Sequence, residues 1–324
     1  MRGSRYLYLL LLLALFLIIP KISETGDIAS RITFDAITFD DGMGINLRSP
    51  RAIFFDKRSG ELTVADAGNN RILIYDRNLK PLYSFDHFVR DRYTGMIIKG
   101  EPKAVAVNSL GEIIVIDNLV EYLEVLDFRG TPLEKLTVGQ ILGDSAVKAR
   151  PECLAIDAAD NLYLGVTGNI TALLMLDKNL KLIRVIGKKG PLPSELNTIL
   201  AVTESDGLLY MTDLYSVPAI KIFDTTGNYI SGFAGHDIEE PDLSLPSGIA
   251  VSKDSIDGTL IWVTDGLRQV VKVYNPEGDM LVQVGGFGYK LGEYQYPAGI
   301  VFSGDGHFFV SEKVGNRIQR FLLK

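Results

Sequence analysis

The sequence predicts an all-β fold, a β-propeller of six four-stranded antiparallel blades. Two observations carry this prediction: one short line of sequence recurs six times, and each copy is followed by further β-branched runs separated by turns. Units of four strands repeating about every 50 residues are typical of propellers, whose blades are four-stranded sheets. We expect the propeller to fill residues 26–324, after a separate N-terminal segment, residues 1–25.

In five of the six units the first strand begins at a proline. Residues 196–202 form the sixth copy, which lacks the proline. After the position that follows the proline, these strands are mostly apolar on both faces, as expected where a blade is packed between two neighbours. A small residue stands two positions after each proline, which suits a crowded central axis: Ala52, Ala104, Cys153, Gly248 and Gly299.

The second strand of most units ends on an acidic residue. Aspartate at a strand-end turn accepts hydrogen bonds from nearby backbone amides, so we expect a structural role for these carboxylates. Arg71 and Arg317 follow two of them and are expected to tie adjacent turns together. The acidic residues are Asp66, Asp117, Asp213, Asp265 and Glu312.

The two ends of the chain predict how the ring closes. The sixth unit stops at Lys324, where its fourth strand should begin, and residues 32–39 form a strand-like run before the first unit. Pairing of this run with the last blade removes an exposed sheet edge. We therefore expect the N-terminal strand to complete blade six.

The first 25 residues predict export. Arg2 and Arg5 precede a 14-residue apolar run, residues 6–19. At about 1.5 Å per residue a helical run of this length spans about 21 Å, short of the roughly 30 Å hydrocarbon core and typical of a signal-peptide core. No Ala-x-Ala cleavage site follows it. Two alternatives remain: an uncleaved membrane anchor with the body facing the periplasm or the extracellular side, or a cleaved signal and a secreted body.

One repeat pattern carries a family resemblance. Residues 60–72 read Gly-x-x-x-Val-x-Asp-x-x-x-Asn-Arg-Ile, residues 308–318 hold a second copy with Glu for Asp, and a glycine-rich loop spans residues 285–294. Over about residues 31–324 the chain resembles the NHL-repeat family of six-bladed propellers. The resemblance implies the fold, and for function it implies a binding platform or, less often, a lyase or lactonase.

Composition excludes several classes of function. The chain has 40 acidic and 33 basic residues and a net charge of −7, which argues against a nucleic-acid partner. A single cysteine, Cys153, rules out a disulfide scaffold. The three histidines fall on opposite sides or opposite faces of the predicted ring, so they are not expected to share a zinc ion.

The strongest candidate binding residues lie on the face where fourth strands lead into first strands. Aromatic and arginine side chains are enriched at recognition surfaces. Three candidates directly follow the repeat prolines and four stand in turns between second and third strands: Arg51, Lys103 and Glu152, then Tyr122, Tyr215, Leu267 and Arg268.

These features lead us to expect a non-enzymatic scaffold that binds a protein or peptide through this rim. The inner-strand positions are mostly Ala, Ile, Val and Leu, whereas a propeller enzyme with a central calcium ion needs Asp, Glu or Asn there. We expect no catalytic residue, no metal and no cofactor, a monomer, and membrane contact through the N-terminal segment only. The alternative is a calcium-dependent lactonase or lyase.

Overall fold

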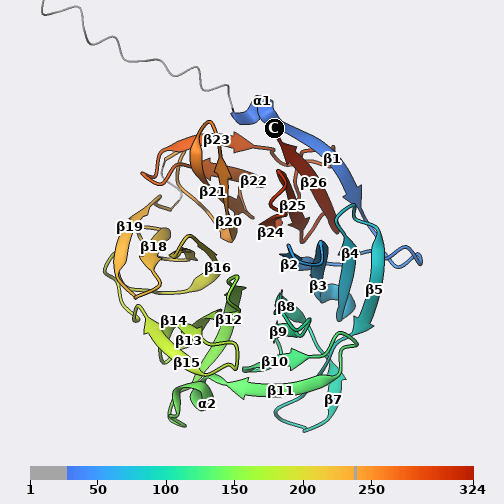
Figure 1. Ribbon diagram of the computed structural model, residues 1–324, viewed down its shortest axis with the longest axis vertical. Coiled ribbons are helices and arrows are strands. Elements are labelled where there is room, and N and C mark those ends of the chain that lie inside the picture. The colour runs from blue at the N-terminus through green and yellow to red at the C-terminus, as the bar shows by residue number, and fades with distance from the viewer. Residues whose placement is uncertain (1–27, 237–238) are drawn as a thin grey trace, which may run out of the picture.

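The protein is a ring of six antiparallel four-stranded blades around a central axis (Figure 1), which confirms the predicted fold. The computed structural model describes residues 28–236 and 239–324. The expected signal or anchor segment, residues 1–25, lies outside them. No helix in the described part of the chain is long and apolar enough to cross a membrane.

The strands of each blade follow one another in sequence from the axis outward. Blade one comprises β2 (Pro50–Asp56), β3 (Glu61–Asp66), β4 (Arg71–Asp76) and β5 (Pro81–Asp86). Blade two comprises β8 (Pro102–Val107), β9 (Ile113–Asp117), β10 (Tyr122–Leu126) and β11 (Pro132–Thr137). Blade three comprises β12 (Ala149–Ile156), β13 (Leu162–Gly168), β14 (Thr171–Leu176) and β15 (Leu182–Ile186). Blade four comprises β16 (Ile199–Ser205), β17 (Leu208–Asp213), β18 (Ile220–Asp224) and β19 (Tyr229–Phe233). Blade five comprises β20 (Pro246–Asp254), β21 (Gly258–Asp265), β22 (Val270–Tyr274) and β23 (Met280–Val284).

Blade six confirms the predicted ring closure. It comprises β24 (Pro297–Phe302), β25 (His307–Glu312), β26 (Arg317–Leu323) and the N-terminal strand β1 (Ile32–Thr38). β1 pairs with β26 from Ile32 opposite Leu323 to Thr38 opposite Ile318. The short helix α1 (Ile28–Arg31) precedes β1, and Arg31 forms an ion pair of 2.8 Å with Asp254 of blade five. The N-terminus therefore links the last two blades.

The apolar core lies between neighbouring blades. All five residues of β9 are buried, whereas the outermost strand of the same blade, β11, is largely exposed. Between blades five and six, the Trp262 ring lies 5.2 Å from that of Phe302 and 5.0 Å from that of Phe308. The second strands are buried along most of their length, which explains why their sequences are mostly apolar.

Two insertions were not predicted from the sequence. A hairpin of β6 (Phe88–Arg90) and β7 (Ile97–Lys99) lies in the connection from blade one to blade two. The helix α2 (Val138–Leu142) lies between blades two and three and is capped reciprocally by Thr137 and Gln140. A five-residue helix is too short to show a helical period in sequence, so the capping residues were its available signal.

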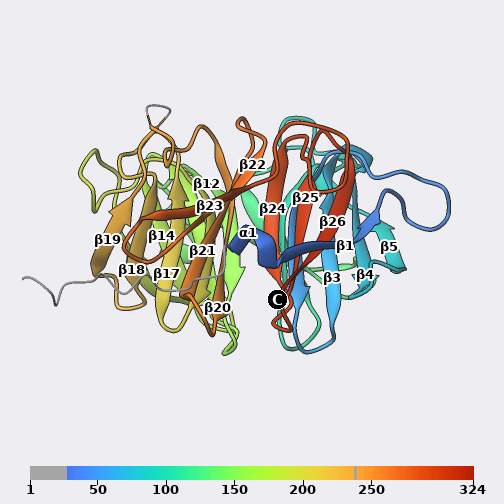
Figure 2. The same ribbon diagram turned by 90° about the horizontal axis from the view of Figure 1, so that it is seen from above.

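The ring has two faces, which Figure 2 shows from the edge. We call the upper face the one formed by the connections from fourth to first strands and from second to third strands. The lower face is formed by the turns from first to second and from third to fourth strands. In an antiparallel meander these two sets of connections lie at opposite ends of the strands.

Candidate functional site

The central channel holds a polar cluster on the inner strands. A cavity of about 130 Å³ is lined by the first strands of all six blades. The residues that directly follow the repeat prolines, Arg51, Lys103 and Glu152, line it. These three, which we call the channel residues, come from consecutive blades. They were predicted as rim residues, and the structure places them inside the channel lining because the position after the proline faces the axis.

Lys103 and Glu152 form a nearly buried ion pair. Lys103 Nζ lies 2.7 Å from Glu152 Oε2, and the two side chains are 10% and 11% exposed. Arg150 Nε donates to Glu152 Oε1 at 2.6 Å. Burial lowers the pKa of Lys103, and the attraction of the Glu152 carboxylate opposes that shift without cancelling it. The Lys103 amine is therefore easier to deprotonate than that of a solvent-exposed lysine.

Arg51 contributes a second cation and an unused donor. Its Nη2 lies 2.8 Å from Glu101 Oε1, which also accepts a hydrogen bond from Asn118 Nδ2 at 2.8 Å. Arg51 Nε is buried and has no hydrogen-bond partner within the described part of the chain. A buried N–H group without a partner costs free energy, so this group is suited to an oxygen atom of a bound ligand.

The remaining predicted rim residues lie apart from this cluster. Tyr215 and Leu267 are 76% and 60% exposed, and Arg268 Nε donates to Ser244 Oγ at 3.1 Å. Tyr122 Oη lies 3.4 Å from Lys135 Nζ. The structure thus brings together three of the seven predicted residues and leaves these four at three separate turns of the upper face, with Leu267 and Arg268 in the same turn.

The strand-end carboxylates hold the loops that enter the inner strands. Asp66 accepts the Arg48 amide at 2.7 Å, and Asp213 accepts the Thr198 amide at 2.6 Å. Asp265 and Glu312 accept the amides of Ser244 and Gln295, both at 2.7 Å. Arg71 lies 2.8 Å from Asp66, and Arg317 lies 2.6 Å from Glu312.

Asp117 differs from the other four carboxylates. Its Oδ1 accepts the amide of Leu119 at 2.8 Å, and its Oδ2 lies 3.3 Å from His87 Nε2. Glu124 Oε2 lies 3.9 Å from the same imidazole nitrogen. All three side chains are 2% exposed. Gly100 makes room for this group, because a Cβ there would lie 2.5 Å from Asp117 Oδ2.

The described channel residues do not fit a calcium ion. Calcium takes six to eight oxygen ligands, mainly carboxylates, carbonyls and water. Both carboxylates near the channel mouth are already engaged, Glu101 by Arg51 and Asn118, and Glu152 by Lys103 and Arg150. Two of the three channel residues are cations that would repel a metal ion. We therefore derive no step through calcium.

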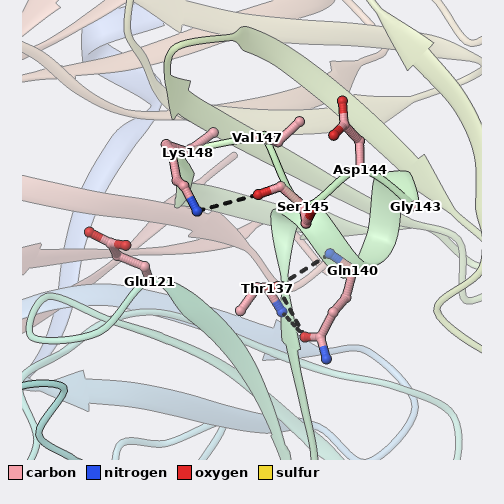
Figure 3. Close-up of a pocket in the computed structure, with 10 residues that line it drawn as sticks. Glu121, Thr137, Gln140, Gly143, Asp144, Ser145, Val147 and Lys148 are labelled. Carbon is pink, nitrogen blue, oxygen red and sulfur yellow. Dashed lines mark hydrogen bonds between the residues drawn. The ribbon is translucent and has the colours of Figure 1, made fainter.

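A larger cavity of about 490 Å³ lies on the upper face between blades two and three (Figure 3). Gln140 and Thr137 line it but are engaged in capping α2, and Lys148 Nζ donates to Ser145 O at 3.3 Å. Ala149, at the start of β12, also lines this cavity, while Glu152 of the same strand lines the channel. Three residues of a strand span about 10 Å, so the two cavities are close neighbours. Sequence reasoning missed this cavity because α2 was not predicted.

Solved structures of known proteins share this ring. A gluconolactonase from Xanthomonas campestris aligns with a TM-score of 0.59 and 13% identity, over 86% of this chain and 88% of its own. A streptogramin B lyase aligns with a TM-score of 0.58 and 16% identity, over 89% and 98%. A virginiamycin B lyase from Staphylococcus aureus aligns with a TM-score of 0.55 and 12% identity, over 90% and 99%. No family model matches the chain, and no curated protein does either.

These comparisons correct the expected function. The similar structures are named as lactonases and lyases, which contradicts the expectation of a non-enzymatic scaffold and favours the enzyme alternative. The expectation was wrong because it judged the inner strands by the small and aliphatic residues two or more positions after the prolines. The charged channel residues stand one position after them. At these identities the likeness itself establishes the six-bladed fold.

Proposed function

We propose that this protein is an enzyme of the lactonase or lyase type, with its active site at the channel residues. One observation carries the proposal: Lys103 and Glu152 form a nearly buried ion pair in the channel lining, and burial lowers the pKa of Lys103. Perturbed ionisable groups in a cavity are typical of catalytic sites. The names of the structures that share the ring support the same class.

The channel residues match what opening a cyclic ester requires. Either hydrolysis or elimination moves a proton and develops negative charge on oxygen. In our proposal Lys103, held in place by Glu152, transfers the proton, because its lowered pKa makes the neutral amine accessible. Arg51 binds the oxygen on which charge develops, through the Nε–H that has no partner within the described chain. This route needs no metal ion.

The proposal also places the enzyme outside the cytoplasm. The apolar run of residues 6–19 supports export, with the segment kept as an anchor or cleaved. The glycine, aspartate and Asn-Arg pattern of residues 60–72 supports membership of the NHL-type propellers. Intact-mass measurement of the exported protein separates anchor from signal, because cleavage removes the N-terminal residues.

The activity is tested with a panel of lactones and cyclic esters, followed by acid release at constant pH. We expect Lys103→Met to lower kcat/KM by about 10²–10⁴, and Arg51→Met to lower kcat by about 10²–10³. Lys178→Met is the matched control, because Lys178 lies exposed in a turn of the lower face. It should leave turnover unchanged.

Two results would contradict the proposal. Wild-type protein that opens no cyclic ester in the panel would argue against the reaction class. Full turnover by Lys103→Met would argue against the channel as the active site. A raised pH optimum in Lys103→Arg would support proton transfer at this position, because guanidinium loses its proton at much higher pH than an amine.

A further inference from the structure

Exposed apolar side chains are concentrated on the upper face of the ring. Of 27 exposed large apolar residues in the described chain, 16 lie in the connections of the upper face. Eight lie on the outermost strands and three on the lower face. The connections from fourth to first strands are longer than the turns of the lower face, and 11 of these 16 residues lie in them. The three on the lower face are Leu110, Phe128 and Ile256.

The most exposed of these side chains occupy three separate loops, which enter blades one, two and six. Met43 is 87% exposed in the first loop, Tyr93 is 80% exposed in the β6–β7 hairpin, and Tyr289 is 77% exposed in the loop before β24. Each loop carries a further exposed apolar residue, Ile45, Met96 and Phe287 respectively. Blades six, one and two are consecutive around the ring, so these loops occupy one sector of it, where the loop after β1 extends outward beyond β5 (Figure 1).

Two of the three loops, 88–97 and 287–291, combine tyrosine with a neighbouring cation, as do segments that enter a membrane–water interface. Tyrosine is amphipathic and concentrates at the level of the lipid headgroups, and neighbouring cations contact the phosphates. The Arg92 guanidinium lies 4.6 Å from the centre of the Tyr93 ring, and the Lys290 side chain, beside Tyr289, is 87% exposed. The apolar residues stand on three separate loops.

If residues 6–19 are kept as an anchor and not cleaved, the chain also carries its own tether to a membrane. The apolar run ends at residue 19, and eight residues join it to Ile28 at the start of α1. Eight residues reach at most about 29 Å. A six-residue strand is about 20 Å long, and α1 lies at the outer edge of the ring, between its two faces (Figure 2). Such a tether is long enough to let either face meet the bilayer, so the apolar loops decide which face does.

We propose that the upper face is a membrane-docking surface, in which loops 39–45, 88–97 and 287–291 enter the lipid headgroup region. This extends the sequence expectation, which limited membrane contact to the N-terminal segment. It also turns the upper end of the channel toward the lipid. The inference is independent of the proposed reaction, because none of the three loops contributes a channel residue.

The test uses the full chain reconstituted into phosphatidylcholine vesicles with brominated acyl chains. Trp262, the single tryptophan, is buried between blades five and six and so is shielded from the lipid. Any quenching by brominated lipid therefore reports the surroundings of an added tryptophan. Tyr93→Trp and Tyr289→Trp place reporters on the upper face. Phe128→Trp is the matched control on the lower face, where Phe128 is 61% exposed. We expect brominated lipid to quench most of the emission added at positions 93 and 289 and none of that added at 128.

Other results would overturn the docking surface. Equal quenching at all three positions, or none at 93 and 289, would show that the upper face does not meet the lipid. Reporters at 93 and 289 that are shielded from aqueous iodide in detergent, together with a dimer in size-exclusion chromatography, would assign the face to a second copy of the chain. Reporters that respond to brominated lipid in a monomer would support the proposal.

Discussion

Blades four and two place opposite charges at one and the same position of the fold. In blade four Lys221 pairs across the sheet with Met211, two residues before Asp213. In blade two Glu124 pairs with Val115, two residues before Asp117. Lys221 Nζ lies 2.9 Å from Asp213 Oδ2, with both side chains fully buried. Glu124 instead adds a second carboxylate beside Asp117 and His87.

The comparison shows that the repeat conserves the position of the strand-end carboxylate but not the identity of its partner. Blade five uses a lysine at the same register position, Lys272, and blade six uses a glutamine, Gln319. Blades one and six add an arginine directly across from the carboxylate, Arg71 and Arg317. Blade two balances its extra negative charge differently, with Lys135 of the outermost strand 2.8 Å from Glu124 Oε1. The contribution of this position to the free energy of unfolding is therefore expected to differ between blades.

The largest effect is expected from Lys221→Met in blade four. Removing one member of a buried pair leaves Asp213 charged and buried, and also removes the donor to Ser216 Oγ, at 2.7 Å, and to the Glu195 carbonyl. We expect the free energy of unfolding to fall by about 3–5 kcal/mol. Urea titration followed by circular dichroism measures it, with Lys178→Met as the control. A loss below 1 kcal/mol would mean that blade four gains little from this pair.

A smaller effect, dependent on pH, is expected at the arginine pair of blade one. Burial opposes ionisation of Asp41, but hydrogen bonds from Arg71 and from the Ile45 and Met43 amides outweigh it and lower the pKa of Asp41. Because the folded pKa lies below the unfolded one, the stabilisation is complete above the unfolded value, 3.8, and is lost as pH falls through the folded pKa.

The variant that tests this is Asp41→Asn. We expect it to lower the free energy of unfolding by about 1.5–3 kcal/mol at pH 7. The difference from wild type should shrink as the pH drops below 3.8, because the wild-type carboxyl then becomes neutral as well. Unfolding curves recorded from pH 2.5 to pH 7 check the trend. A difference that is constant over this range would contradict it.

The smallest effect is expected from Glu124→Gln in blade two. The substitution keeps the shape of the side chain, removes a like charge near Asp117, and frees Lys135, which is 38% exposed and stays solvated. These contributions oppose each other, so we expect a change of less than about 1 kcal/mol in either direction. The same urea titration applies. A loss as large as that of Lys221→Met would remove the distinction between the two blades.

The repeats made the fold predictable, and ring closure followed from the missing last strand. The position after the repeat proline also identified Arg51, Lys103 and Glu152. Their location inside the channel could not be read from the sequence, because it depends on which side of the pleat faces the axis. Arg150 and Asn118, which complete the ion pairs, stand before a repeat proline and in a turn, and the residue types at these positions differ between blades.

The group of His87, Asp117 and Glu124 was hidden for a related reason. His87 belongs to the connection after blade one, and the two acidic residues belong to consecutive strands of blade two. By its place in the repeat, Asp117 is predicted to be one more structural aspartate. Aligning the third strands of all blades would have revealed a glutamate where blades four and five have lysine. The hairpin β6–β7 and the helix α2 escaped because both are shorter than the periods on which such predictions rest.

The pairing of β1 with β26 sets a time order on the formation of this molecule. Ile32 and Leu323 are separated by 291 positions, yet they lie opposite each other in one sheet. The strand made first therefore waits without its partner until the strand made last has been synthesised and has crossed any membrane on its route. Contacts so distant in sequence form slowly. Until then blade six lacks its outer strand, and β26 presents an open edge to which other chains can add. We therefore expect closure of the ring to come late in folding, and the interval before it to favour aggregation and proteolysis.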